Sequence, residues 1–181
     1  MNRIVLSGCA ALAVVAAAPA AAQVTGQVDV NGFVDDRCQF TVDNAVINLG
    51  EISDGDGKLD EAAVDAGTAN LNGWCNGSAA TIKVEAHPLL NSAAGSASFD
   101  NRVDYRATAT AGPAAPFDDS DDAGAGADAS LGLFSGEIVV DISASASPND
   151  RLMVAGDYVG SIVVTLTPNT SFGGEESPGD A

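Results

Sequence analysis

The segment spanning residues 23–34 alternates between small apolar and mostly polar residues, and this alternation constrains the fold more than any other feature of the chain. Valine or glycine stands at every even position, namely Val24, Gly26, Val28, Val30, Gly32 and Val34. The odd positions are polar, apart from Phe33. A period of two places alternate side chains on opposite faces of a β-strand. The segment is therefore predicted to be a strand with one apolar face, placed before Cys38.

The first 22 residues have the pattern of a secretory signal peptide. A single positive charge at Arg3 precedes an apolar run over residues 4–18, and three alanines stand directly before Gln23. These are the parts of a cleavable leader. No other stretch approaches the roughly 18 apolar residues that a transmembrane helix needs. The mature chain is therefore expected to begin at Gln23 and to be exported and soluble, without membrane insertion.

The chain is strongly acidic, with a formal net charge of −18 that becomes −19 once Arg3 leaves with the leader. The phosphates of nucleic acids and of anionic membranes would be repelled by such a surface. The sequence therefore predicts no nucleic-acid partner. Solubility of an abundant extracellular protein is the ordinary role of this acidity, and a specific use toward cations or acid-poor partners is the alternative.

Two cysteines, Cys38 and Cys75, remain after the leader and its Cys9 are removed. In an oxidising compartment an even pair forms one disulfide by default. Closing a loop of about 38 residues removes unfolded-state entropy worth roughly 4 kcal/mol. No C-x-x-C motif accompanies the pair, so a structural role is predicted rather than a redox role.

The remaining pattern is typical of an all-β sandwich. Short segments rich in Val, Ile and Thr are separated by Gly, Asn, Asp and Pro, and no helix of more than a turn or two is evident. After the first segment, strands are expected over residues 38–49 with a break near Asp43, and over 69–75, 80–86, 103–109, 137–143, 152–154 and 158–167.

Two polar stretches are expected to remain outside the packed domain, which is predicted to span residues 35–168. Residues 112–132 are rich in Ala, Asp and Gly, and we expect a long surface loop that is too polar and too flexible to pack. Residues 169–181 form an acidic tail that we expect to be disordered. Pro88, which has no ladder donor, is expected to end the strand before it.

Several of these residues resemble one known family. The run GQVDVNGFV at 26–34, followed by Cys38 and then by Ile47-Asn48-Leu49-Gly50 and Ile52, resembles the opening of chaperone-usher pilin subunits of the type 1 class. Cys75 falls where that family places its second cysteine, and residues 155–166 are similar to its final strand. The related spore coat protein U family shares these features. The likeness covers residues 24–85 and 155–168, and the chain departs from the type 1 pattern by continuing past Pro168.

The resemblance implies an incomplete immunoglobulin-like (pilin) β-sandwich with one disulfide, which lacks its last strand and is completed by a strand from another subunit. The implied function is that of a structural subunit of an extracellular fimbria, pilus or coat, which contributes to surface adhesion or biofilm. The implied partners are neighbouring copies or related pilin subunits, a periplasmic chaperone and an outer-membrane usher, on a route through the periplasm to the cell surface. The resemblance assigns the donor strand to Val24, Gly26, Val28, Val30, Gly32 and Val34, and the acceptor groove to Ile162, Val164 and Leu166.

The alternative is a secreted single-domain sandwich that recognises carbohydrate or another surface and does not polymerise. Residues 23–34 would then pair within their own sandwich. Trp74, beside Cys75, could stack on sugars, but a role as core or surface cover is expected.

No enzyme, cofactor or metal site is predicted. His87 is the only histidine, and no G-x-S-x-G motif accompanies it. Asp54, Asp56 and Gly57 resemble the middle of a calcium loop, but Ile52 and Ala63 occupy two of the ligand positions. A solvated turn is therefore expected there.

Overall fold

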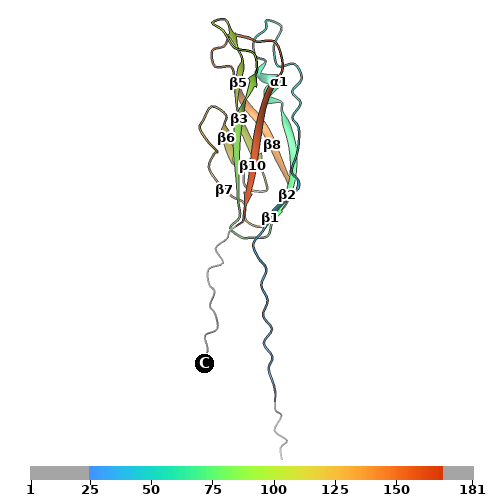
Figure 1. The fold of residues 1–181 in the computed structure, drawn as a ribbon. Coiled ribbons are helices and arrows are strands. Elements are labelled where there is room, and N and C mark those ends of the chain that lie inside the picture. The colour runs from blue at the N-terminus through green and yellow to red at the C-terminus, as the bar shows by residue number, and fades with distance from the viewer. Residues whose placement is uncertain (1–24, 169–181) are drawn as a thin grey trace, which may run out of the picture. The chain divides into compact units, whose positions relative to one another are not determined.

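The computed structural model describes residues 25–168, which fall into two units, one ending at Phe33 and the other beginning at Val34 (Figure 1). Strands make up 48% of the described residues and helix 3%, so the predicted all-β class is confirmed. In this part of the chain no helix has the length and apolar character that a membrane span requires. The predicted leader, Val24 and the predicted acidic tail lie outside the described residues.

Six long strands and four short ones build the second unit, together with one short helix. The long strands form a sheet in the order β1-β2-β8-β5-β3-β10, with antiparallel neighbours throughout. The elements are β1 (Cys38–Val42), α1 (Glu61–Asp65), β2 (Thr68–Cys75), β3 (Thr81–Asn91), β4 (Phe99–Asp100), β5 (Arg102–Thr110), β6 (Phe117–Asp119), β7 (Ala129–Ser130), β8 (Phe134–Ala146), β9 (Leu152–Met153) and β10 (Tyr158–Thr167).

Alternate residues of the long strands point into a single core, as the period of two in the sequence requires. The apolar residues of β3, β5 and β8 that are at most 5% exposed are Ile82, Val84, Ala86, Val103, Tyr105, Ala107, Ala109, Ile138, Val140 and Ile142. β3 and β5 pair only at Leu89–Val103 and Leu90–Arg102 and then diverge. The sheet therefore turns over at this point, so that β1-β2-β8-β5 and β3-β10 cover the same core.

Residues 112–132 pack against the domain, so the prediction that they are too polar and too flexible to pack is wrong, although residues 121–125 lie exposed at the surface. The backbone N–H groups of Gly126 and Leu131 donate to the carbonyls of Val84 and Ala80, at 2.9 and 2.8 Å. The carboxylate of Asp118 accepts a hydrogen bond from the backbone N–H of Ala86 at 2.8 Å. These bonds satisfy the part of the β3 edge that β5 leaves free, and a buried strand needs such partners.

Pro88 does not end its strand, contrary to prediction, because the ladder is irregular at that point. Leu90 pairs with Val159 and His87 pairs with Ser161, so two residues of β3 lie opposite the single residue Gly160. Such a β-bulge tolerates a residue without a ladder donor. A Cβ on Gly160 would lie 2.8 Å from the carbonyl oxygen of His87, so glycine is required at this crossing.

The first predicted strand of the domain is shorter than expected. β1 ends at Val42, and residues 43–52 belong to no helix or strand. The break lies at Asp43, where the sequence indicated one. The expected strand at 152–154 is the two-residue β9, which pairs in parallel with β4.

Asp100 is a buried carboxylate at the end of the domain where β4 and β9 pair. It accepts hydrogen bonds from the backbone N–H groups of Asn149 and Arg151, at 3.1 and 3.2 Å, and from the Asn149 side-chain amide at 2.8 Å. Burial raises the pKa of Asp100, but the hydrogen bonds from Asn149 and Arg151 outweigh it, and the pKa lies below its usual value. The ionised carboxylate thus holds residues 149–151 against β4.

Replacing this carboxylate should lower the free energy of unfolding by an amount that depends on pH. Asp100→Asn is expected to lower the free energy of unfolding at neutral pH by about 1.5–3 kcal/mol, the usual contribution of hydrogen bonds to a charged group. Because the folded-state pKa is below the ordinary value of 3.8, this contribution is present above that pH and is lost as the pH falls through the folded pKa. Urea unfolding of both proteins at several pH values measures the difference.

The exposed Asp121 offers the matched control, since Asp121→Asn should change the free energy of unfolding by less than about 0.5 kcal/mol. A difference between wild type and Asp100→Asn that stays constant down to about pH 2 would contradict the assigned role of the ionised carboxylate.

Candidate acceptor groove

A disulfide fixes the edge of the sheet where the domain begins. Cys38 of β1 is bonded to Cys75 of β2, with 4.1 Å between their Cα atoms, so the expected bridge is present. The two residues are also direct partners in the strand register. Next to the bridge, the Asn76 side chain accepts a hydrogen bond from the Arg37 backbone N–H at 2.6 Å and donates one to the Asp35 carbonyl at 2.9 Å. The entry of the chain into β1 is therefore fixed by covalent and polar contacts.

A cleft of about 510 Å³ lies between β10 and the stretch of residues 43–49. Ile162 and Val164 of β10 line one wall, and Ile47 and Leu49 line the other. Its floor is apolar and comes from β2, β3, β5 and β8, through Ala69, Leu71, Leu89, Tyr105, Val140 and Ile142. A second hollow shares Val46, Ile47, Leu49, Leu89 and Gly160 with this cleft and continues along β10 to Met153. We refer to the two together as the groove.

The three residues predicted to form an acceptor surface lie on the inward face of β10 and are only half-buried. Ile162 and Val164 line the groove. Leu166 instead packs where the two layers meet, since a Cβ on Gly73 of β2 would lie 3.2 Å from its Cδ1 atom. The groove therefore opens along β10 up to Val164, and Leu166 lies at its closed end.

The second wall was not predicted, although the alternation of Ile47 and Leu49 carried a signal for it. Both side chains press against Gly67, where a Cβ would lie 2.9 Å from Ile47 Cγ2 and 2.8 Å from Leu49 Cδ2. Glycine at position 67 thus allows the wall to approach the end of α1. The floor residues come from four strands that are distant in sequence, and no local pattern could have joined them.

The groove has unpaired backbone on both sides. β10 pairs with β3 along one edge, and its other edge faces the groove. Within the described part of the chain, residues 43–51 make no backbone-to-backbone hydrogen bond. Unpaired N–H and C=O groups beside an apolar floor form a template for another strand.

Tyr105 anchors the floor of the groove to the bulge in β3. Its hydroxyl lies 2.7 Å from the carbonyl oxygen of His87 and 3.3 Å from that of Ser161, and can donate to either. Burial raises the pKa of Tyr105 to about 12, so the hydroxyl keeps its proton at any ordinary pH. This contact ties β5 to both β3 and β10 where the floor and one wall meet.

The segment predicted to be a donor strand is exposed in the structure. Residues 25–33 form no strand, and the side chains of Val28, Val30 and Phe33 are 87%, 90% and 89% exposed. Gly26 and Gly32 are also exposed, as is Val34 at the start of the second unit. The apolar side chains of this segment thus lie in water.

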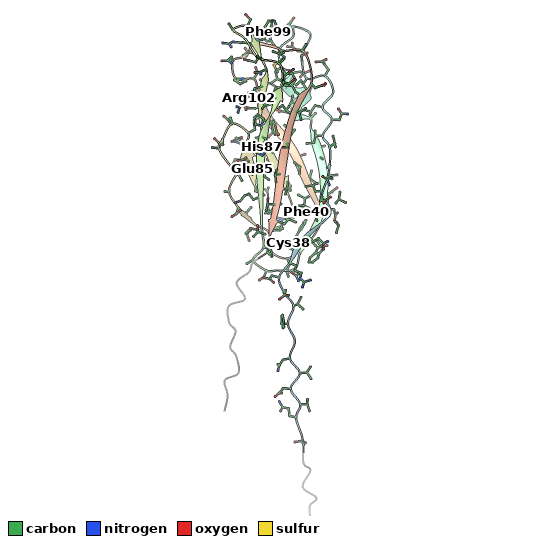
Figure 2. All side chains as sticks on the ribbon, viewed as in Figure 1. Cys38, Phe40, Glu85, His87, Phe99 and Arg102 are labelled. Atoms are coloured by element: carbon green, nitrogen blue, oxygen red, sulfur yellow. A yellow bond between two sulfur atoms is a disulfide. The ribbon has the colours of Figure 1, made fainter. Side chains whose placement is uncertain are left out.

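The other candidate residues lie away from the groove. His87 is on the solvent side of β3, with Nε2 3.7 Å from Oε1 of Glu85, and the two side chains lie close together in Figure 2. Oδ1 of Asp54 accepts hydrogen bonds from the backbone N–H groups of Asp56 and Lys58, both at 2.9 Å, which builds a turn. Among residues 25–168, no cluster of three or more His, Cys, Asp or Glu side chains could hold a metal ion.

No protein-family model, curated protein or solved structure matches this chain. Its function must therefore be argued from its own residues and their arrangement.

Proposed function

We propose that this chain is a structural subunit that polymerises by strand exchange, with residues 24–34 of one copy occupying the groove of the next. The observation that carries the proposal is the groove itself, whose apolar floor lies between two unpaired backbone edges. The same chain carries a segment whose apolar face lies in water. A strand with one apolar face and free backbone groups satisfies both the floor and the edges.

Burial of the donor valines would supply enough free energy to hold two copies together. Val24, Val28, Val30 and Val34 would each gain about 1.5–3 kcal/mol, or roughly 6–12 kcal/mol together before ordering costs. The lengths also agree, because eleven extended residues span about 36 Å, close to the span of β10 and the residues before it that line the groove. Backbone pairing along both walls would slow the separation of two joined copies.

The strand order supports a finer description of the fold, namely an immunoglobulin-like sandwich that lacks its last strand. A constant-type immunoglobulin domain has strands A, B, E and D in one sheet and C, F and G in the other. If the long strands are lettered A to F in chain order, β1, β2, β8 and β5 become A, B, E and D, which is the order of the first sheet. β3 and β10 become C and F of the second sheet. The position of strand G, beside β10, is the position of the groove.

This assignment agrees with the resemblance to pilin and coat subunits in the sequence. We propose that the polymer is an extracellular fimbria or coat that contributes to surface adhesion or biofilm. An exposed apolar groove is prone to wrong associations, so a periplasmic chaperone would cover it before an outer-membrane usher adds the subunit to the fibre. No catalytic step is assigned to the chain.

The test is whether the mature chain forms oligomers that survive detergent without heating. We expect a ladder of bands for the wild type on an unheated denaturing gel, and a single band for the double variant Val28→Asp with Val30→Asp. The matched control places two aspartates on the polar face, at Thr25 and Asn31, and should keep the ladder. Loss of the ladder in both variants, or its absence in the wild type secreted at high concentration, would contradict strand exchange.

A further inference from the structure

The side chains of β2 that point away from the core have an unusual composition. The side chains that alternate away from the buried Gly73 and Cys75 are those of Asn70, Asn72 and Trp74. Asparagine is depleted in strands because it packs poorly on a pleated surface. Departures from local propensity of this kind concentrate at functional sites.

Neighbouring strands extend this row into a patch. Gln39 of β1 and Ser135 of β8 flank Trp74, and Glu137 of β8 lies opposite Asn72. Thr41 Oγ1 donates to Asn72 Oδ1 at 3.0 Å, which fixes the amide with its N–H groups free. Beyond Asn70 follow Val139 of β8 and Thr110 of β5. We call this patch the outer face.

Trp74 is neither fully buried nor hydrogen-bonded through its indole N–H, as a core tryptophan would be. Its side chain is half-buried, and its indole N–H makes no hydrogen bond to any of residues 25–168. Because no buried side-chain nitrogen or oxygen in residues 25–168 lacks a partner, the indole N–H must reach solvent. A half-buried aromatic ring whose polar group reaches solvent offers both stacking and a hydrogen bond to a ligand.

The outer face as defined carries little charge, although the chain carries −18. Glu137 is its one ionisable residue, and the others offer amides, hydroxyls, an indole and one aliphatic side chain. Charge on this side of the sheet begins at the end of the patch, where Asp141 follows Val139 and lies opposite Thr68. Amides both donate and accept hydrogen bonds, as sugar hydroxyls do. An acidic ligand would be repelled by the rest of the surface, whereas a neutral one would not.

We propose that the outer face binds neutral polysaccharide, with a sugar ring stacked on Trp74 and the hydroxyls of the chain bound by Asn70, Asn72 and Gln39. The row from Asn70 to Trp74 is about 14 Å long, so it accommodates an extended glycan rather than one sugar unit. The face lies on the other side of the sheet from the groove, because Asn70, Asn72 and Trp74 alternate with the groove residues Ala69 and Leu71. Binding is therefore independent of strand exchange, although a polymer would multiply the number of sites and raise the avidity.

Trp74 is the only tryptophan of the chain, so its fluorescence reports directly on this face. The experiment titrates the full mature chain with cello-, chito- and malto-hexasaccharides and follows the tryptophan emission. We expect a saturable change with at least one of them. The double variant Asn70→Ala with Asn72→Ala should bind about tenfold more weakly, which corresponds to one or two lost hydrogen bonds.

Ser92→Ala is the control, because Ser92 is exposed and belongs to neither the groove nor the outer face. It should bind as the wild type does. A separate readout is retardation in a native gel that contains hydroxyethylcellulose, where Trp74→Ala should weaken binding about thirtyfold and Trp74→Phe less. Melting curves confirm that the variants are folded.

Three outcomes would overturn the proposal. One is the absence of a saturable change with all three oligosaccharides up to about 5 mM, which corresponds to negligible affinity. The second is equal binding by wild type and the Asn70, Asn72 double variant. The third is an equal loss of binding in Ser92→Ala, which would show that the effect of the asparagine variants is not specific to the outer face.

Discussion

The oxidised domain of residues 35–181 is expected to melt on the order of 10 °C higher when a peptide of residues 23–34 is present at about 100 times its dissociation constant. At that concentration, binding to the folded state adds about 2.7 kcal/mol of stability. For a domain of about 150 residues, each kcal/mol raises the melting temperature by about 2–4 °C. The physical cause is the burial of Val28 and Val30 on a floor that is otherwise open to water.

Two altered peptides distinguish insertion of the strand into the groove from non-specific binding of the peptide to the domain. Aspartate at positions 28 and 30 places charges on the apolar floor and should abolish the rise, because burying an unpaired charge is strongly unfavourable. Aspartate at positions 25 and 31 adds the same charge on the polar face and should preserve it. If the domain already melts high and ignores all three peptides, its sandwich is complete without a donor, and strand exchange is refuted.

Removing the disulfide should have the second large effect. Replacing Cys38 and Cys75 together by alanine is expected to lower the free energy of unfolding by roughly 4 kcal/mol, the entropy of closing a loop of about 38 residues. Typical domains are stable by about 5–15 kcal/mol, so the loss removes a large fraction of the total. Urea unfolding of the full mature chain and of the double variant measures the difference.

A reducing agent supplies the control for this variant. It should destabilise the wild type by a similar amount and leave the alanine variant unchanged. Equal stability of the oxidised and reduced wild type would show that the bridge adds nothing beyond the packing of β1 on β2.

The strands with strong alternation were predictable from the sequence because burial follows the same period as the backbone. The predicted strand 158–167 has the bounds of β10, and Tyr158 to Leu166 alternate as expected. β2 was predicted to within a residue at its start, and the pairing of Cys38 with Cys75 followed from the even count of cysteines. In each case the deciding information is local or compositional.

The failures concern features that are decided at long range. Residues 112–132 look like a flexible loop because their own side chains are small and polar. They nevertheless hydrogen-bond to backbone groups of Val84 and Ala86 in β3 and of Ala80 just before it. Pro88 stays in its strand because Gly160, more than 70 residues later, allows a bulge.

The same limit applies to the groove. The alternation in 158–167 predicted the strand, and only the resemblance assigned Ile162 and Val164 to a groove. The wall at Ile47 and Leu49 depends on their contact with Gly67, and the floor depends on the turn between β3 and β5. The tertiary fold therefore decides what lies across from β10.

If the chain polymerises as proposed, the packing of residues 112–132 against β3 would limit each copy to one acceptor edge. With that edge covered, the long strands of the domain end in β1 and β10, and both border the same groove. Under the proposed strand exchange, each copy would have one acceptor groove and one donor segment. Head-to-tail contacts of this kind do not close on themselves unless the rotation between copies brings the chain into a ring. Growth would therefore proceed along a single axis, giving an unbranched thread whose length is limited only by the supply of subunits.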